Sequence, residues 1–111
     1  MITTLDNKYA FVGLVGSSLV QICIDSQTII KDYGEIHGDI IRSMAVTTDS
    51  NVLITYGDDM RVKKFSIESQ EVVKDFPLKY GYYQTIMLAP GDDSLFVYDE
   101  NCGLKLIDLA D

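Results

Sequence analysis

The sequence predicts an all-β protein built from repeated antiparallel, four-stranded sheets, and two observations carry this prediction. The segment 24–33 reads IDSQTIIKDY, and forty-three residues later the segment 67–76 reads IESQEVVKDF; five of the ten positions are identical and four more are conservative exchanges. A self-match at a period in the low forties is typical of four-stranded propeller blades. Short apolar, β-branched runs separated by turn residues recur along the chain, and no twelve-residue stretch keeps a helical apolar period. We therefore expect about two and a half blades of a β-propeller, which is an incomplete ring.

Residues 1–34 are expected to form a partial first blade whose innermost strand is missing or vestigial. Three strands are predicted at 8–13, 19–24 and 28–33, because these apolar runs are bounded by Asp-Asn, Gly-Ser-Ser and Asp-Ser turn sequences. The short segment 2–5 is a remnant of the innermost strand in this interpretation.

Residues 35–78 are expected to form a complete middle blade. Its four strands are predicted at 41–47, 52–56, 61–67 and 71–76, in the order from the innermost to the outermost strand. The turn sequences Asp-Ser-Asn, Gly-Asp-Asp and Glu-Ser separate them, and such residues favour tight turns.

Residues 79–111 are expected to form a partial last blade that lacks an outer strand. Strands are predicted at 84–89, 95–98 and 104–109. The second of these is apolar at consecutive positions, which indicates burial on both faces of the sheet. A blade packed between two neighbours meets that condition.

Composition excludes several classes of partner. The chain has 111 residues and a net charge of −8, and an anionic surface repels both nucleic-acid phosphates and anionic lipids. No apolar run approaches the roughly 20 residues that a membrane helix needs, and the first residues do not resemble a secretory signal. Cys23 and Cys102 lie at non-equivalent repeat positions, which disfavours a disulfide and a metal site. We therefore expect a reduced, intracellular, cytoplasmic protein.

The unit at 37–67 resembles a blade of the WD-repeat family along its whole length. The family opens with a Gly-His pair; its histidine corresponds to His37, although the preceding residue here is not glycine. The family run Val-x-Ser-Val-Ala-Phe-Ser-Pro-Asp-Gly is echoed by IRSMAVTTDS at 41–50, and the hairpin aspartate falls on Asp59. The signature Trp-Asp pair falls on 65–66, which reads Phe-Ser and departs from the family pattern.

The resemblance implies both a structural motif and a role. In the family, the histidine, the hairpin aspartate, a strand hydroxyl and the tryptophan form a buried hydrogen-bonded chain that braces the blade. Carried over by position, His37, Thr55 and Asp59 would form three links, whereas Phe65 cannot donate a hydrogen bond and would end the chain early. Family members are non-catalytic scaffolds that bind other proteins, so a protein partner and no cofactor are expected.

The sequence contains two enzyme-like signals. The tetrapeptide Tyr56-Gly57-Asp58-Asp59 also occurs at the metal-binding hairpin of RNA-dependent RNA polymerases, where paired aspartates hold two ions. The chain is too short for a polymerase palm with its neighbouring domains, and the repeat already explains the segment. His37 is the single histidine, so a histidine-based metal or acid–base site has little to build on. We expect no catalytic residue and no metal ligand.

A candidate interaction surface comprises two charged residues of the middle blade and three tyrosines of the following connection: Asp39, Arg42, Tyr80, Tyr82 and Tyr83. Exposed tyrosines are effective binding anchors, although packing against the neighbouring blade is the simpler interpretation for these rings. The alternative function is a small-ligand or glycan-binding propeller assembled from several copies, with Tyr82 and Tyr83 as stacking platforms.

Propellers close with about 4–8 blades, so two and a half blades leave an apolar face bare at each end. Covering about 500 Å² of such a face is worth about 12 kcal/mol before entropy is subtracted. We therefore expect the rest of a longer propeller chain, or further copies of this chain, to cover these faces. Strand counting favours the longer chain, because head-to-tail copies would bring six strands to a four-stranded blade.

Overall fold

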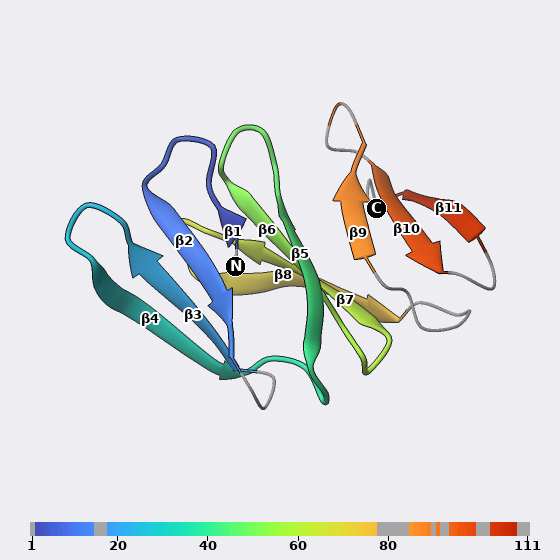
Figure 1. The fold of residues 1–111 in the computed structure, drawn as a ribbon, viewed down its shortest axis with the longest axis horizontal. Coiled ribbons are helices and arrows are strands. Elements are labelled where there is room, and N and C mark those ends of the chain that lie inside the picture. Colours follow the sequence, from blue (N-terminus) through green and yellow to red (C-terminus); the bar gives the residue numbers. More distant parts are fainter. Residues whose placement is uncertain are drawn as a thin grey trace.

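The computed structural model describes residues 2–14, 18–77, 85–89, 91, 94–99 and 103–108 (Figure 1). Every regular element in these ranges is a β-strand, and every strand pairing is antiparallel. The all-β prediction is confirmed. Among the described residues, no helix has the length and apolar character required to cross a membrane.

The first sheet consists of β1 (Ile2–Thr3), β2 (Tyr9–Gly13), β3 (Ser18–Cys23) and β4 (Thr28–Glu35), paired in this order. The innermost strand is therefore present, but it has only two residues, and Ile2 lies opposite Phe11 of β2.

The middle sheet follows the same order, with β5 (Ile41–Val46), β6 (Val52–Gly57), β7 (Arg61–Ser66) and β8 (Glu71–Pro77). In the third sheet the described strands are β9 (Thr85–Leu88), β10 (Ser94–Asp99) and β11 (Gly103–Asp108), with β10 in the centre. The sheets fan out side by side (Figure 1), and all observed strand ends lie within two residues of the predicted ones.

The two near-identical decapeptides adopt equivalent structures. Each begins with a tight turn whose glutamine has a positive φ, 57° at Gln27 and 61° at Gln70. In each turn the glutamine N–H donates to a carbonyl four residues earlier, that of Cys23 or Ser66, at 2.8 Å. Each decapeptide then continues as the outermost strand, β4 or β8. The sequence repeat is therefore a structural repeat.

Both outermost strands contain a bulge at the same repeat position. Gln21 pairs with Lys31 and the next residue of β3 pairs with Ile29, so one residue of β4 has no partner opposite it. The same shift between Lys64 and Phe65 leaves one residue of β8 without a partner. These extra residues are Ile30 and Val73.

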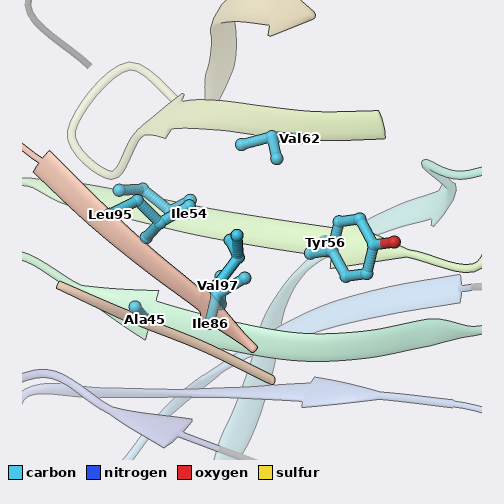
Figure 2. Packing of buried hydrophobic residues seen from close by; sticks show 7 residues of the cluster. All are labelled: Ala45, Ile54, Tyr56, Val62, Ile86, Leu95 and Val97. Atoms are coloured by element: carbon cyan, nitrogen blue, oxygen red, sulfur yellow. The ribbon is translucent and has the colours of Figure 1, made fainter. Parts of the chain in front are cut away.

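The core lies between the sheets. Leu53 of β6 belongs to a buried cluster shared with the first sheet, whereas its neighbour Ile54 belongs to a cluster shared with the third sheet. Side chains of Ala45, Ile54, Tyr56 and Val62 from the middle sheet pack against Ile86, Leu95 and Val97 from β9 and β10 (Figure 2). Successive β6 residues therefore face different neighbours, which explains the consecutive apolar residues in the strand.

Polar contacts also join neighbouring sheets, one between innermost strands and one between turns. The hydroxyl of Ser43 on β5 accepts a hydrogen bond from the backbone N–H of Ile86 on β9 at 3.2 Å. Between the first two sheets, the hydroxyl of Ser50 accepts from the backbone N–H of Asp6 at 3.2 Å. These hydrogen bonds help to set the position of each sheet relative to its neighbour.

Candidate functional site

The middle sheet carries a buried hydrogen-bonded chain centred on His37, whose exposed fraction is 3%. Its Nδ1 lies 2.9 Å from Oδ1 of Asp59, and its Nε2 lies 2.8 Å from Oγ1 of Thr55. An ionised carboxylate only accepts hydrogen bonds, so Nδ1–H donates to Asp59 and Nε2 accepts from the Thr55 hydroxyl. The three side chains come from the β4–β5 connection, from β6 and from the β6–β7 turn.

Asp59 also fixes two backbone segments. Its Oδ2 accepts from the N–H of Gly38 at 2.8 Å, and its Oδ1 accepts from the N–H of Arg61 at 3.2 Å. One carboxylate therefore ties the connection that enters the middle sheet to the turn between its second and third strands.

The surroundings shift the pKa values of both partners. Burial lowers the pKa of His37 below its ordinary value, against the opposing effect of the Asp59 carboxylate. Burial alone would raise the pKa of Asp59, but the hydrogen bonds from Gly38 and His37, with the N–H of Arg61, hold it below its usual range. At neutral pH the contact is therefore a hydrogen bond between a neutral imidazole and a carboxylate.

Gly57 is part of this arrangement, although sequence reasoning did not single it out. A Cβ on Gly57 would lie 2.7 Å from Cγ of His37, 2.8 Å from its Nδ1 and 2.9 Å from Oδ1 of Asp59. Only glycine allows the imidazole and the carboxylate to approach the backbone this closely. A glycine at the end of a strand, two residues before the predicted hairpin aspartate, was the available signal.

Phe65, which stands at the family's tryptophan position, lies apart from the hydrogen-bonded chain in an apolar contact. Its exposed fraction is 2%, and its ring meets that of Tyr33 edge to face, with centroids 5.5 Å apart at 75°. The Tyr33 hydroxyl in turn donates to Oε1 of the buried Gln21 at 2.8 Å. An aromatic contact between β7 and β4 therefore occupies this position.

The residues of the candidate interaction surface lie close to the braced loops. Nε of Arg42 donates to Oδ1 of Asp58 at 2.9 Å, and its Nη2 donates to the other oxygen. Side-chain exposure is 46% for Arg42 and 19% for Asp58. Asp39 is exposed and accepts from the N–H of Ile40. The three predicted tyrosines, Tyr80, Tyr82 and Tyr83, lie outside the described residues.

A cleft of about 290 Å³ opens beside this surface, between the first sheet and the innermost strand of the middle sheet. Its walls are mixed, with apolar side chains next to a guanidinium and a hydroxyl: Ile2, Gly13, Ile41, Arg42, Ser43 and Met44.

The polymerase-like tetrapeptide has a different arrangement from a metal-binding hairpin. Tyr56 is fully buried in the core, Asp58 is paired with Arg42, and Asp59 accepts from His37. Each carboxylate is thus held by its own donor. Within the described ranges no group of three or more histidine, cysteine or acidic side chains could hold a metal ion.

A second repeated polar motif was missed in the sequence. Oγ1 of Thr4 donates to Oδ1 of Asp6 at 2.6 Å, and Oγ1 of Thr47 donates to Oδ1 of Asp49 at the same distance. Each carboxylate also accepts a backbone N–H two residues later, at 3.0 Å and 2.9 Å. The signal was a Thr-x-Asp pattern recurring at the established period of forty-three residues.

Comparison with known proteins supports the fold. No protein-family model matches the sequence, and no curated protein matches it. A crystal structure of RRP9 WD40 repeats superposes with a TM-score of 0.87 at 14% sequence identity, covering 98% of this chain and 34% of that chain. The predicted propeller-blade fold is confirmed, and the chain spans about a third of the matched structure's length.

Proposed function

We propose that the chain is a non-catalytic protein–protein interaction scaffold, a fragment or subunit of a WD-repeat-type propeller. Its blades are 1–34, 35–78 and 79–111 in this proposal. The observation that carries it is a half-exposed, oriented guanidinium, that of Arg42, beside loops fixed by the buried chain of His37, Thr55 and Asp59. Rigid polar loops bind a protein partner at a low entropic cost.

The chemistry of the surface fits a protein ligand. Arg42 is oriented by Asp58 and Asp39 is exposed, so the surface offers both signs of charge within one loop region. The neighbouring cleft adds apolar walls. A polypeptide segment with polar and aliphatic side chains matches this mixture, whereas the net charge of −8 repels nucleic acid and anionic membranes. The half-buried free thiol of Cys23 agrees with a reducing cytoplasmic location.

Selection of binding peptides from a random display library tests the proposal. We expect peptides that lose more than about tenfold in affinity on Arg42→Ala or Asp39→Ala, because each substitution removes a polar contact at the surface. Glu68→Ala is the matched control, since Glu68 is an exposed acidic residue in the β7–β8 turn. Selected peptides whose affinity depends on Glu68 and is unchanged by both surface substitutions would contradict the proposed site.

A further inference from the structure

The loops at one end of the middle sheet carry an excess of negative charge. The β4–β5 connection and the β6–β7 turn lie at the same end, because successive antiparallel strands reverse direction (Figure 1). Together with the first residues of β5 they contain three carboxylates, on Asp39, Asp58 and Asp59, and one guanidinium, on Arg42. The His37 imidazole beside Asp59 is neutral at pH 7, since burial lowers its pKa. Two of the carboxylates therefore have no counter-charge within these loops.

The guanidinium of Arg42 is neutralised by Asp58 but keeps N–H groups for another acceptor. Its Nε and Nη2 each donate to one oxygen of Asp58, and a guanidinium has about five N–H groups in all. The ion pair has no net charge, so it attracts a further anion only weakly. The remaining N–H groups of Arg42 can still donate to a neutral oxygen, such as the carbonyl of a peptide bond.

Asp39 is the carboxylate of this site that a ligand can reach. Its side chain is exposed, and its Oδ1 accepts from the N–H of Ile40 at 2.8 Å. Asp58 is the main cause of the raised pKa of Arg42 and Asp39 contributes to it, which indicates that both carboxylates lie near the guanidinium. Asp59, by contrast, is only 15% exposed and is held by its own donors. An arriving cation therefore meets Asp39 first.

Aliphatic side chains adjoin these charges. The cleft beside Arg42 has three half-buried apolar side chains in its walls, those of Ile2, Ile41 and Met44. The next residues along the chain from two of the cleft positions are strongly exposed: Ile40 at 51% and Leu14 at 47%. Exposed apolar side chains gathered at a cleft and bordered by charged groups are typical of a surface that binds a protein segment.

We infer that the partner of this site is a basic polypeptide segment, with a lysine or arginine paired to Asp39 and an aliphatic side chain in the cleft. Arg42 donates to a main-chain carbonyl of the same segment. This inference rests on the proposed function and specifies the chemistry of the partner. Charge complementarity selects a basic segment, because an acidic or phosphorylated one would bring more negative charge to loops that already have it in excess.

The charge of Asp39 can be separated from its hydrogen-bonding capacity. Asp39→Asn keeps the size of the side chain and an acceptor oxygen but removes the charge, so it should reduce affinity as much as Asp39→Ala does. The peptides used are those selected from a random display library that depend on Arg42, and we expect them to be enriched in lysine and arginine. Their affinity should fall as salt is raised from about 0.05 to 0.5 M, because salt screens exposed charge pairs.

Glu68→Gln is the matched control for Asp39→Asn. Glu68 is also an exposed carboxylate, but it lies in the β7–β8 turn at the opposite end of the middle sheet. The substitution changes the total charge by the same amount and should leave the affinity within about twofold, since distant exposed charges are screened. Circular dichroism establishes that both variants keep the fold.

An exchange of charges tests whether the pairing is direct. Asp39→Lys should weaken a basic peptide by more than about tenfold, because it places two like charges together. Replacement of one basic residue of that peptide by glutamate should restore binding to the Asp39→Lys variant and weaken binding to the unaltered chain. Recovery at one particular peptide position indicates contact, whereas a general effect of potential would be the same for every basic residue.

Gly13→Ala tests the aliphatic part of the assignment. Gly13 lines the cleft, and its new methyl would lie at an ordinary 3.5 Å from Ile41, so the fold tolerates it. The methyl takes space from the cleft and should lower the affinity of a peptide with a large aliphatic residue by about fivefold or more. The same peptide with alanine at that position should bind both forms of the chain equally. Equal losses for the two peptides contradict the assignment of the cleft.

The outcomes separate the chemistry of the partner from the existence of the site. Arg42-dependent peptides that lack basic residues, or that Asp39→Asn leaves unaffected, overturn the inference while the proposed site stands. Acidic peptides that bind Asp39→Asn more tightly than the unaltered chain also overturn it, since the sign of the partner's charge is then reversed. Peptides that depend on neither Arg42 nor Asp39 contradict the proposed site itself, and the basic partner with it.

Discussion

Gly57→Ala tests whether the close approach of His37 and Asp59 to the backbone stabilises the middle sheet. The new methyl would lie 2.7 Å from Cγ of His37 and 2.9 Å from Oδ1 of Asp59. Either the backbone shifts, at an overpacking cost of about 1–3 kcal/mol, or the imidazole moves and leaves the Thr55 hydroxyl without its acceptor, at about 1–3 kcal/mol. Both responses cost a similar amount, so we expect a loss of about 1–3 kcal/mol whichever of them prevails.

Urea unfolding followed by circular dichroism measures this loss. With an m-value of about 1.5 kcal/mol/M, a loss of 3 kcal/mol lowers the midpoint by about 2 M. Gly13→Ala is the control, since Gly13 also ends the second strand of its sheet and its Cβ would meet Ile41 at an ordinary 3.5 Å. Equal effects of the two substitutions would refute the reasoning. In a double-mutant cycle, Gly57→Ala and Thr55→Val should be non-additive, because both act on one hydrogen-bonded chain.

Three further predictions concern the same hairpin. The free energy of unfolding should fall on acidification, first below about pH 6.5 and again below about pH 3.8, because the pKa values of His37 and Asp59 are lowered in the folded chain and the unfolded chain therefore binds protons more readily. Urea unfolding at a series of pH values measures this fall, and a free energy of unfolding that rises in acid would contradict the prediction. Asp59→Asn should cost about 1–3 kcal/mol, whereas Asp58→Asn, in an exposed ion pair, should cost less than about 1 kcal/mol; thermal unfolding ranks them, and the reverse order would contradict the bracing role. Met60→Gly should stabilise the chain by up to about 1 kcal/mol, since Met60 has a φ of 63°; an unchanged or lower urea midpoint would count against this.

The arrangement of strands could be predicted because local and periodic signals agree. Turn residues mark the strand ends, and the self-match between 24–33 and 67–76 assigns the same place to two outermost strands. Even the doubly buried character of β6 follows from its run of apolar residues, since Leu53 and Ile54 face different neighbouring sheets. These features depend on short-range sequence or on one repeat period.

The details of the candidate site depend on contacts that no short pattern records. The steric role of Gly57 depends on the position of His37, twenty residues earlier in the chain, and becomes visible only with coordinates. At Phe65, where the family has a polar link, the ring contacts Tyr33 of the adjacent sheet, and no short pattern around Phe65 records this contact. The resemblance to a family located His37, but it could not foresee how the departure at Phe65 is accommodated.

The bulges at Ile30 and Val73 have a consequence for solubility. Both outermost strands carry exposed β-branched residues and an unpaired backbone edge, which is the composition that favours strand-by-strand growth into amyloid-like ladders. A bulge interrupts the regular spacing of N–H and C=O groups along that edge, and the lysine that follows it in each strand adds a charge. The equivalent bulges in β4 and β8 thus oppose the addition of a further strand to either edge.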